Sequence, residues 1–182
     1  MFFLEIKPLP PEEWHKYREF RVNALKQSPN EFIRDFEEEA HIPKEVWVRK
    51  LKEAQKGEKF WLFFGMEVGR DPVAMISASL GEGNKINHIA TIAGPYVLPE
   101  NREDGLDIKL IKTIIQELEK NPGIRKMRAF VAIDQRELVS TYVNLGFDVM
   151  GELVGEIKTE KGYMNEYVFE RNIRTEGNIE TL

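Results

Sequence analysis

The stretch that most constrains the fold runs from Ile86 to Phe147, roughly a third of the chain. It reads in order as a strand, a turn rich in Pro and Gly, an amphipathic helix, a buried strand and a shorter helix. A helix that begins soon after a strand end presents free backbone amides, because its first four N–H groups have no partner within the helix. Such amides bind phosphate groups. The stretch therefore predicts an α/β protein with a site for a phosphate-bearing cofactor.

Composition excludes several other classes. The chain has 182 residues, 42% of them hydrophobic, which is enough for one domain with a sizeable core. The formal net charge is −5 with both signs dispersed, so the basic footprint of a nucleic-acid-binding protein is absent and a cationic or neutral substrate is favoured. Cysteine is absent, which excludes disulfides, thiolate metal sites and a catalytic thiol. The three histidines lack metal-ligand spacing, and we expect no metal.

Membrane and targeting segments are not predicted. The longest strongly apolar stretch, Phe60 to Met66, is far below the length that spans a bilayer. The start MFFLEIK has neither a basic region nor a cleavage signal. We therefore expect a cytoplasmic protein without membrane association, with one domain over residues 1–171 and a polar tail over 172–182.

Apolar periodicity and the positions of Pro and Gly divide the chain into strands and helices. The expected strands are 2–7, 60–66, 73–80, 86–98, 127–133, 149–157 and 163–169. The expected helices run from Pro10 to Lys26, onward from Pro43 through Leu51, from 105 to 120 and from 136 to 145. Gly94 and Pro95 interrupt the fourth strand, and because proline has no N–H to donate, we expect the sheet to open there.

Four short motifs occur in the order found in a known superfamily. In sequence they are WHKYREFRVNALKQSPNEF, GRDPVAMISAS, VSTYVNLGF and YMNEYVFER. Together with the order of elements, they resemble the GNAT superfamily of N-acetyltransferases from Phe2 to about Arg171. The resemblance implies an α/β (α+β) fold. Its central sheet is mixed, mostly antiparallel and of about seven strands, with four flanking helices and a splay near the end of the fourth strand.

The resemblance also implies acetyl-CoA as co-substrate. In the family, amides at a strand end hold the pantetheine, and amides of the next loop and helix start hold the pyrophosphate. The corresponding cofactor-binding positions here are Tyr96, Val97, Leu98, Arg102, Glu103, Asp104, Gly105, Leu106 and Asp107, with Gln135 in place of a family asparagine. Arg102 and Gly105 fit the family loop. Asp107 replaces a small residue and Glu103 a common glycine, and since carboxylates repel phosphate, weakened binding is expected.

Covalent catalysis has little support, because the chain has no cysteine and no G-x-S-x-G motif. Direct attack by a substrate amine needs a base, a donor that polarises the carbonyl, and an acid for the leaving thiolate. Tyr142 matches the tyrosine that is the acid in many members, although its spacing from Leu138 also fits a core residue. A backbone amide near Val97 or Leu98 would polarise the carbonyl.

The general base is left open among three side chains. His88 is a candidate catalytic residue because histidine is a common general base, although a lone histidine on a strand is more often structural. Glu82 and Glu166 are the alternatives.

The amine acceptor is expected near the first two helices and the final hairpin. Residues expected to line it there are Phe32, Phe36, Glu37 to Glu39, Trp47 and Tyr163, and the aromatic ones alternatively serve packing. The leading hypothesis is an acetyl-CoA-dependent N-acetyltransferase for a small-molecule or peptide amine. The alternative, favoured by the acidic loop, is a protein of the same fold that has lost turnover and binds an acyl-CoA or another ligand as a regulatory module. A homodimer is an expectation from the resemblance alone.

Overall fold

The computed structural model describes residues 4–173, so the expected tail from residue 174 onward lies outside the described residues. The strands are β1 (Leu4–Lys7), β2 (Phe60–Glu67), β3 (Ala74–Leu80), β4 (Ile89–Val97), β5 (Lys126–Ala132), β6 (Asp148–Thr159) and β7 (Gly162–Asn172). The α-helices are α1 (Trp14–Gln27), α2 (Phe36–Ala40), α3 (Lys44–Lys56), α4 (Leu106–Glu119) and α5 (Arg136–Asn144). Three short 3-10 helices are η1 (Pro11–Glu13), η2 (Pro29–Glu31) and η3 (Pro99–Asp104).

The strands form a sheet in the order β1-β2-β3-β4-β5-β7-β6. β4 and β5 are parallel, whereas β1 with β2, β2 with β3, β5 with β7, and β6 with β7 pair antiparallel. The prediction of a mixed, mostly antiparallel sheet of about seven strands is confirmed. β4 pairs with β5 only over Ile89 to Ile92, although β5 continues to Ala132. Pairing therefore ends just before Gly94 and Pro95, where the sequence predicts that the sheet opens.

Two local predictions were wrong. The helix count of four omits α2, a helix of five residues that is too short for apolar periodicity to reveal. Its stability comes from a capping box, in which Asp35 accepts from the Glu38 amide at 2.8 Å and Glu38 accepts from the Asp35 amide at 3.3 Å.

The segment from Ile86 to His88 forms turns before β4 instead of strand, with the Ile86 amide bonded to the Gly83 carbonyl at 3.2 Å.

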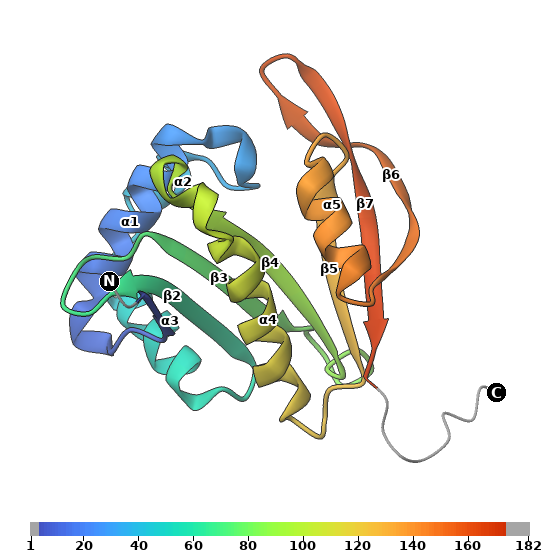
Figure 1. Ribbon diagram of the computed structural model, residues 1–182. Helices are drawn as coiled ribbons and strands as arrows, with labels where there is room; N and C mark the ends of the chain where they lie inside the picture. Colours follow the sequence, from blue (N-terminus) through green and yellow to red (C-terminus); the bar gives the residue numbers. More distant parts are fainter. Residues whose placement is uncertain (1–3, 174–182) are drawn as a thin grey trace. The chain divides into compact units, whose positions relative to one another are not determined.

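The chain divides into two compact units, residues 1–79 with 93–116 and residues 80–92 with 117–182. In the first unit, α1 and α3 lie on one side of β2 and β3, and α4 crosses the other side (Figure 1). Phe64 on β2 meets the ring of Tyr17 at 5.3 Å. Its neighbour Gly65 leaves room for Leu106 of α4, because a Cβ there would lie 3.2 Å from a Leu106 methyl carbon. The missing side chain thus lets α4 pack closely on the sheet.

In the second unit, α5 packs against β5 and β7 (Figure 1). The contact is aromatic: the ring of Tyr142 stacks on Phe169 at 5.7 Å and meets Phe147 edge-on at 5.1 Å. Glu170, next along β7, points to the other face and pairs with Lys126 at 2.7 Å and with Arg128. Across residues 4–173, none of the helices combines the length and apolar character needed to cross a bilayer.

Candidate active site

The end of β4 carries three of the expected cofactor-binding residues. Tyr96 and Val97 are buried, and the Leu98 amide donates to the Val73 carbonyl at 2.9 Å. Of the two amides expected to polarise an acetyl carbonyl, the one on Leu98 therefore already has an acceptor within the chain.

The Arg102 side chain already forms contacts within the protein. Its Nε donates to the Val97 carbonyl at 3.0 Å, and its Nη2 pairs with Oε1 of Glu31 at 2.8 Å. The guanidinium carbon lies 5.9 Å from the centre of the Tyr96 ring. A phosphate that uses Arg102 must therefore compete with the Glu31 carboxylate.

The start of α4 provides the amides that the sequence analysis assigns to a pyrophosphate. Gly105 ends η3 in the left-handed region with φ of +61°, a conformation that favours glycine. The first internal bond of α4 runs from the Lys109 amide to the Gly105 carbonyl at 3.2 Å, so the amides of Leu106, Asp107 and Ile108 precede it. A Cβ on Gly105 would meet no atom within 4 Å, which leaves space beside these amides. This helix start fits an anionic group.

Of Glu103, Asp104 and Asp107, the structure describes only the side chain of Asp107. Asp107 lies in the first turn of α4 and is partly exposed, so its carboxylate opposes an anion at these amides. Glu103 and Asp104 belong to η3, and their side chains lie outside the described part of the chain. Their expected role in cofactor binding stays a prediction.

Tyr142 is the most deeply placed of the expected catalytic residues. It is 0% exposed, and burial raises the pKa of its phenol well above the ordinary value. The phenol therefore carries its proton at neutral pH, as a group must before it can act as a general acid. The aromatic contacts to Phe147 and Phe169 show that the same residue is also part of the core.

Gln135 lies directly before α5. Its amide donates to the Ala132 carbonyl at 3.0 Å, and its own carbonyl accepts from the Val139 amide at 3.0 Å. Its backbone therefore joins the end of β5 to the start of α5, and its side chain is partly exposed.

His88 lies directly before β4, whereas Tyr96 lies near the end of that strand. The His88 carbonyl accepts from the amides of Arg125 at 2.8 Å and Lys126 at 3.3 Å, and so aligns the start of β5 with the start of β4. The structure thus gives the backbone of His88 a structural role, and its role as a base stays a prediction.

Glu166 is the most buried of the three candidate bases. It lies on β7 between Ala132 of β5 and Leu153 of β6, on the face opposite to Phe169. It is 8% exposed, and burial together with the nearby Glu156 raises the pKa of its carboxyl above the usual value. Glu82, the other carboxylate considered from sequence, is exposed.

Replacing Glu166 by glutamine is expected to increase stability at neutral pH. Because the folded-state pKa is raised, the unfolded chain loses its proton first as pH rises above about 4.3, and the wild type loses stability through this window. Thermal unfolding from pH 3 to 8 measures the effect, and the Tm of Glu166→Gln relative to wild type should rise with pH. The exposed Glu160→Gln is the control. A relative Tm that is flat or falls with pH would contradict the raised pKa.

The residues expected around the acceptor divide between core and surface. Trp47 is 0% exposed, donates from Nε1 to the Ile42 carbonyl at 3.1 Å, and meets Tyr17 at 4.8 Å. Glu39 is 2% exposed. The packing alternative is therefore confirmed for Trp47, and Glu39 is buried although it was expected to line the acceptor site. Tyr163 on β7 is strongly exposed.

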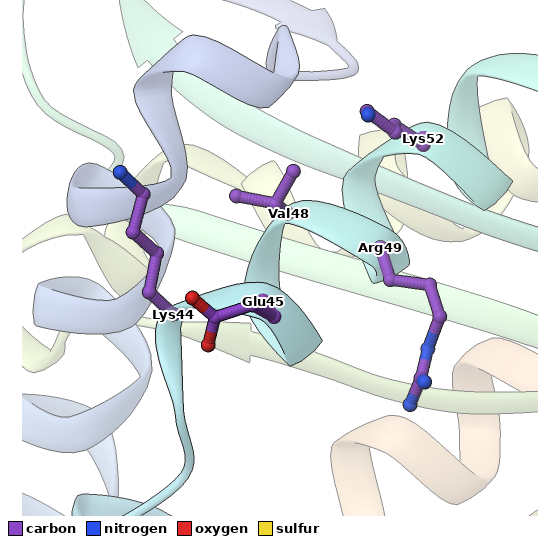
Figure 2. Close-up of a pocket in the computed structure, with 5 residues that line it drawn as sticks. All are labelled: Lys44, Glu45, Val48, Arg49 and Lys52. Atoms are coloured by element: carbon purple, nitrogen blue, oxygen red, sulfur yellow. The ribbon is translucent and has the colours of Figure 1, made fainter.

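A shallow pocket lies along the outer side of α3 (Figure 2). Its lining residues are Lys44, Glu45, Val48, Arg49 and Lys52, none of which is an expected site residue. Within residues 4–173, no group of three or more His, Cys, Asp or Glu side chains is placed to hold a metal ion.

The start of α4, which follows the end of β4 and the short helix η3, offers backbone amides to an anionic group such as a phosphate. The Acetyltransferase (GNAT) domain family matches residues 12–168, and the chain belongs to this family of acetyltransferases. The family expected from the sequence motifs is thereby confirmed. No curated protein sequence matches the chain significantly.

Solved structures show the same fold at low sequence identity. A GNAT-family acetyltransferase from Streptococcus pneumoniae is 14% identical with a TM-score of 0.81, over 94% of this chain and all of that one. The yncA protein of Salmonella typhimurium with its cofactor acetyl-CoA is 13% identical with a TM-score of 0.80, over 99% of both chains. The ribosomal-protein-S18-alanine N-acetyltransferase of Escherichia coli is 17% identical with a TM-score of 0.68, over 99% of this chain and all of that one.

Proposed function

We propose that the protein is an N-acetyltransferase that moves the acetyl group of acetyl-CoA directly to a primary amine. The observation that carries this proposal is the start of α4, with its amides at Leu106, Asp107 and Ile108 and the open space beside Gly105. Acetyl-CoA in the yncA structure supports the co-substrate. The alanine N-acetyltransferase among the structural neighbours supports an amine acceptor.

When bound, the co-substrate supplies an acetyl thioester, so that one carbon–nitrogen bond forms and one carbon–sulfur bond breaks. The backbone at Leu106, Asp107 and Ile108 binds the pyrophosphate. Glu166 accepts the proton that the amine loses, since its raised pKa makes it a stronger base than an ordinary glutamate. The protonated Tyr142 donates a proton to the departing sulfur. His88 is the alternative base.

Calorimetric titration with acetyl-CoA, at low and moderate salt, tests this function first. We expect saturable binding with a micromolar Kd, and release of CoA when an amine acceptor is added. Glu31→Gln removes the carboxylate that holds Arg102 and should tighten binding by up to about fivefold, the range of one exposed ion pair. Glu12→Gln, an exposed acid at the start of η1, is the matched control.

Absence of binding at millimolar acetyl-CoA would overturn the proposal. Binding without turnover against any amine would instead favour the second candidate, a ligand-binding module of the same fold. Asp107 in the first turn of α4 and the Arg102–Glu31 pair are the observations that favour that candidate.

A further inference from the structure

A buried ion pair joins α1 to α2 in the first unit. Arg21 donates from Nε to Oε2 of Glu39 and from Nη2 to Oε1, both at 2.8 Å. The two side chains are 16% and 3% exposed. Both carboxylate oxygens of Glu39 are therefore already used by one guanidinium in a bidentate pair.

Two more cations act electrostatically on this pair, and a third acts on one of those two. Lys50 on α3 and Arg34 before α2 interact electrostatically with Glu39, and Arg49 interacts with Lys50. Within the described residues, the side chains of these three form no hydrogen bond or ion pair, and the Lys50 ammonium lies 5.5 Å from the centre of the Trp47 ring. Figure 2 shows Arg49 extended away from α3 and from the other labelled side chains. We call Arg21, Arg34, Arg49 and Lys50 the cation cluster.

Glu39 neutralises only one of the positive charges in this cluster. Burial and the surrounding cations lower the pKa of Lys50, with Glu39 opposing them in part. Asp35 and Glu38 are bonded to each other's backbone amides in the capping box of α2, and Glu37 is exposed. A local excess of positive charge therefore remains in a chain whose net charge is −5.

Two aromatic rings connect the cluster to the end of β4 in the candidate active site. The Arg21 guanidinium lies 4.4 Å from the centre of the Phe32 ring, and Phe32 lies 5.0 Å from Tyr96. Tyr96 directly precedes Val97 and Leu98. The cation cluster is thus held in contact with the element that carries the expected pantetheine site.

We propose that the cation cluster binds an anionic group, a carboxylate or a phosphate, carried by the amine acceptor. This inference rests on the proposed function, because it assigns the cluster to the acceptor of that reaction. A partly buried ammonium gains strongly from an anion that replaces its lost hydration, and free guanidinium groups bind carboxylate or phosphate through two parallel hydrogen bonds. Polyamines and other polycationic acceptors are repelled by the same charges.

Matched amines that differ by one anionic group test the inference. We would compare kcat/KM for phenylalanine with phenethylamine, and for phosphoethanolamine with ethanolamine. The anionic partner in at least one pair should be preferred by about tenfold or more, the range of one charge-assisted hydrogen bond. The pair with the larger preference identifies carboxylate or phosphate.

Variants assign the preference to the cluster. Lys50→Gln should reduce the preference about tenfold. Arg34→Gln, at an exposed position before α2, should reduce it in the same direction without disturbing the core. Lys56→Gln makes the same charge change in the last turn of α3, outside the cluster, and should leave the preference unchanged.

The outcomes separate the two proposals. If amines are acetylated with no preference for the anionic partner, or if Lys50→Gln and Arg34→Gln retain the preference, the inference is overturned while the proposed function stands. If the protein neither binds acetyl-CoA nor acetylates any amine, the proposed function fails, and the assignment of the cluster to an acceptor fails with it.

Discussion

Replacement of Tyr142 by phenylalanine is expected to lower kcat by about 10²-fold to 10⁴-fold, the contribution of a positioned general acid. Burial keeps the phenol protonated, and the substitution removes only its hydroxyl. Phenylalanine keeps the stacking on Phe169 and the edge contact with Phe147. The fold should therefore persist while turnover falls. Steady-state CoA release and thermal unfolding of the same preparation measure the two effects separately.

Tyr167→Phe is the matched control for this experiment. Tyr167 also contacts the Phe169 ring, at 6.3 Å, and has no proposed chemical role. The Tyr167→Phe variant should keep almost the full kcat of the wild type. If Tyr142→Phe keeps full turnover, Tyr142 serves only the core, and the acid must be sought elsewhere.

Replacement of Glu39 by glutamine is expected to cost about 3 kcal/mol of stability, because it leaves the buried Arg21 without its counter-charge. For a chain of this size, that loss lowers Tm by about 6 to 12 °C. Lys50 and Arg34 add to the effect, since they lose the same carboxylate. Chemical and thermal denaturation at pH 7 measure it, with the exposed Glu37→Gln on the same short helix as control.

The stability lost in Glu39→Gln is expected to become smaller as pH falls. Burial raises the pKa of Glu39, but the hydrogen bonds from Arg21 and the nearby cations outweigh burial, so the net pKa lies below the ordinary value. The stabilisation is therefore complete above about pH 4.3 and is lost as pH falls through the folded-state pKa. The gap between wild type and Glu39→Gln should narrow in acid.

A double variant distinguishes a true buried pair from a general loss of packing. Arg21→Met combined with Glu39→Leu replaces both charges by apolar groups and should recover most of the lost stability. A double variant that is less stable than Glu39→Gln would contradict the assignment of the loss to an uncompensated charge.

Local sequence patterns predicted the helix start in the candidate site but not the ion pair beside it. Gly105 and the start of α4 follow from a strand, a loop and an apolar helical repeat, which are local patterns. The ion pair of Arg102 with Glu31 joins residues 71 positions apart, and no local pattern predicts it. For the same reason, Arg102 matched a phosphate-binding motif in sequence while the structure pairs it with a carboxylate.

The sequence by itself determined the strands, the long helices and the family, because these depend on periodicity, on turn residues and on short motifs whose physics acts within a few residues. Only the tertiary structure decided which charges are buried, since burial depends on segments distant in the chain. The sequence predicted that Glu39 would line the acceptor site, yet it is enclosed against Arg21 of α1. Folding also brings Lys50 of α3 and Arg34 within electrostatic reach of that pair.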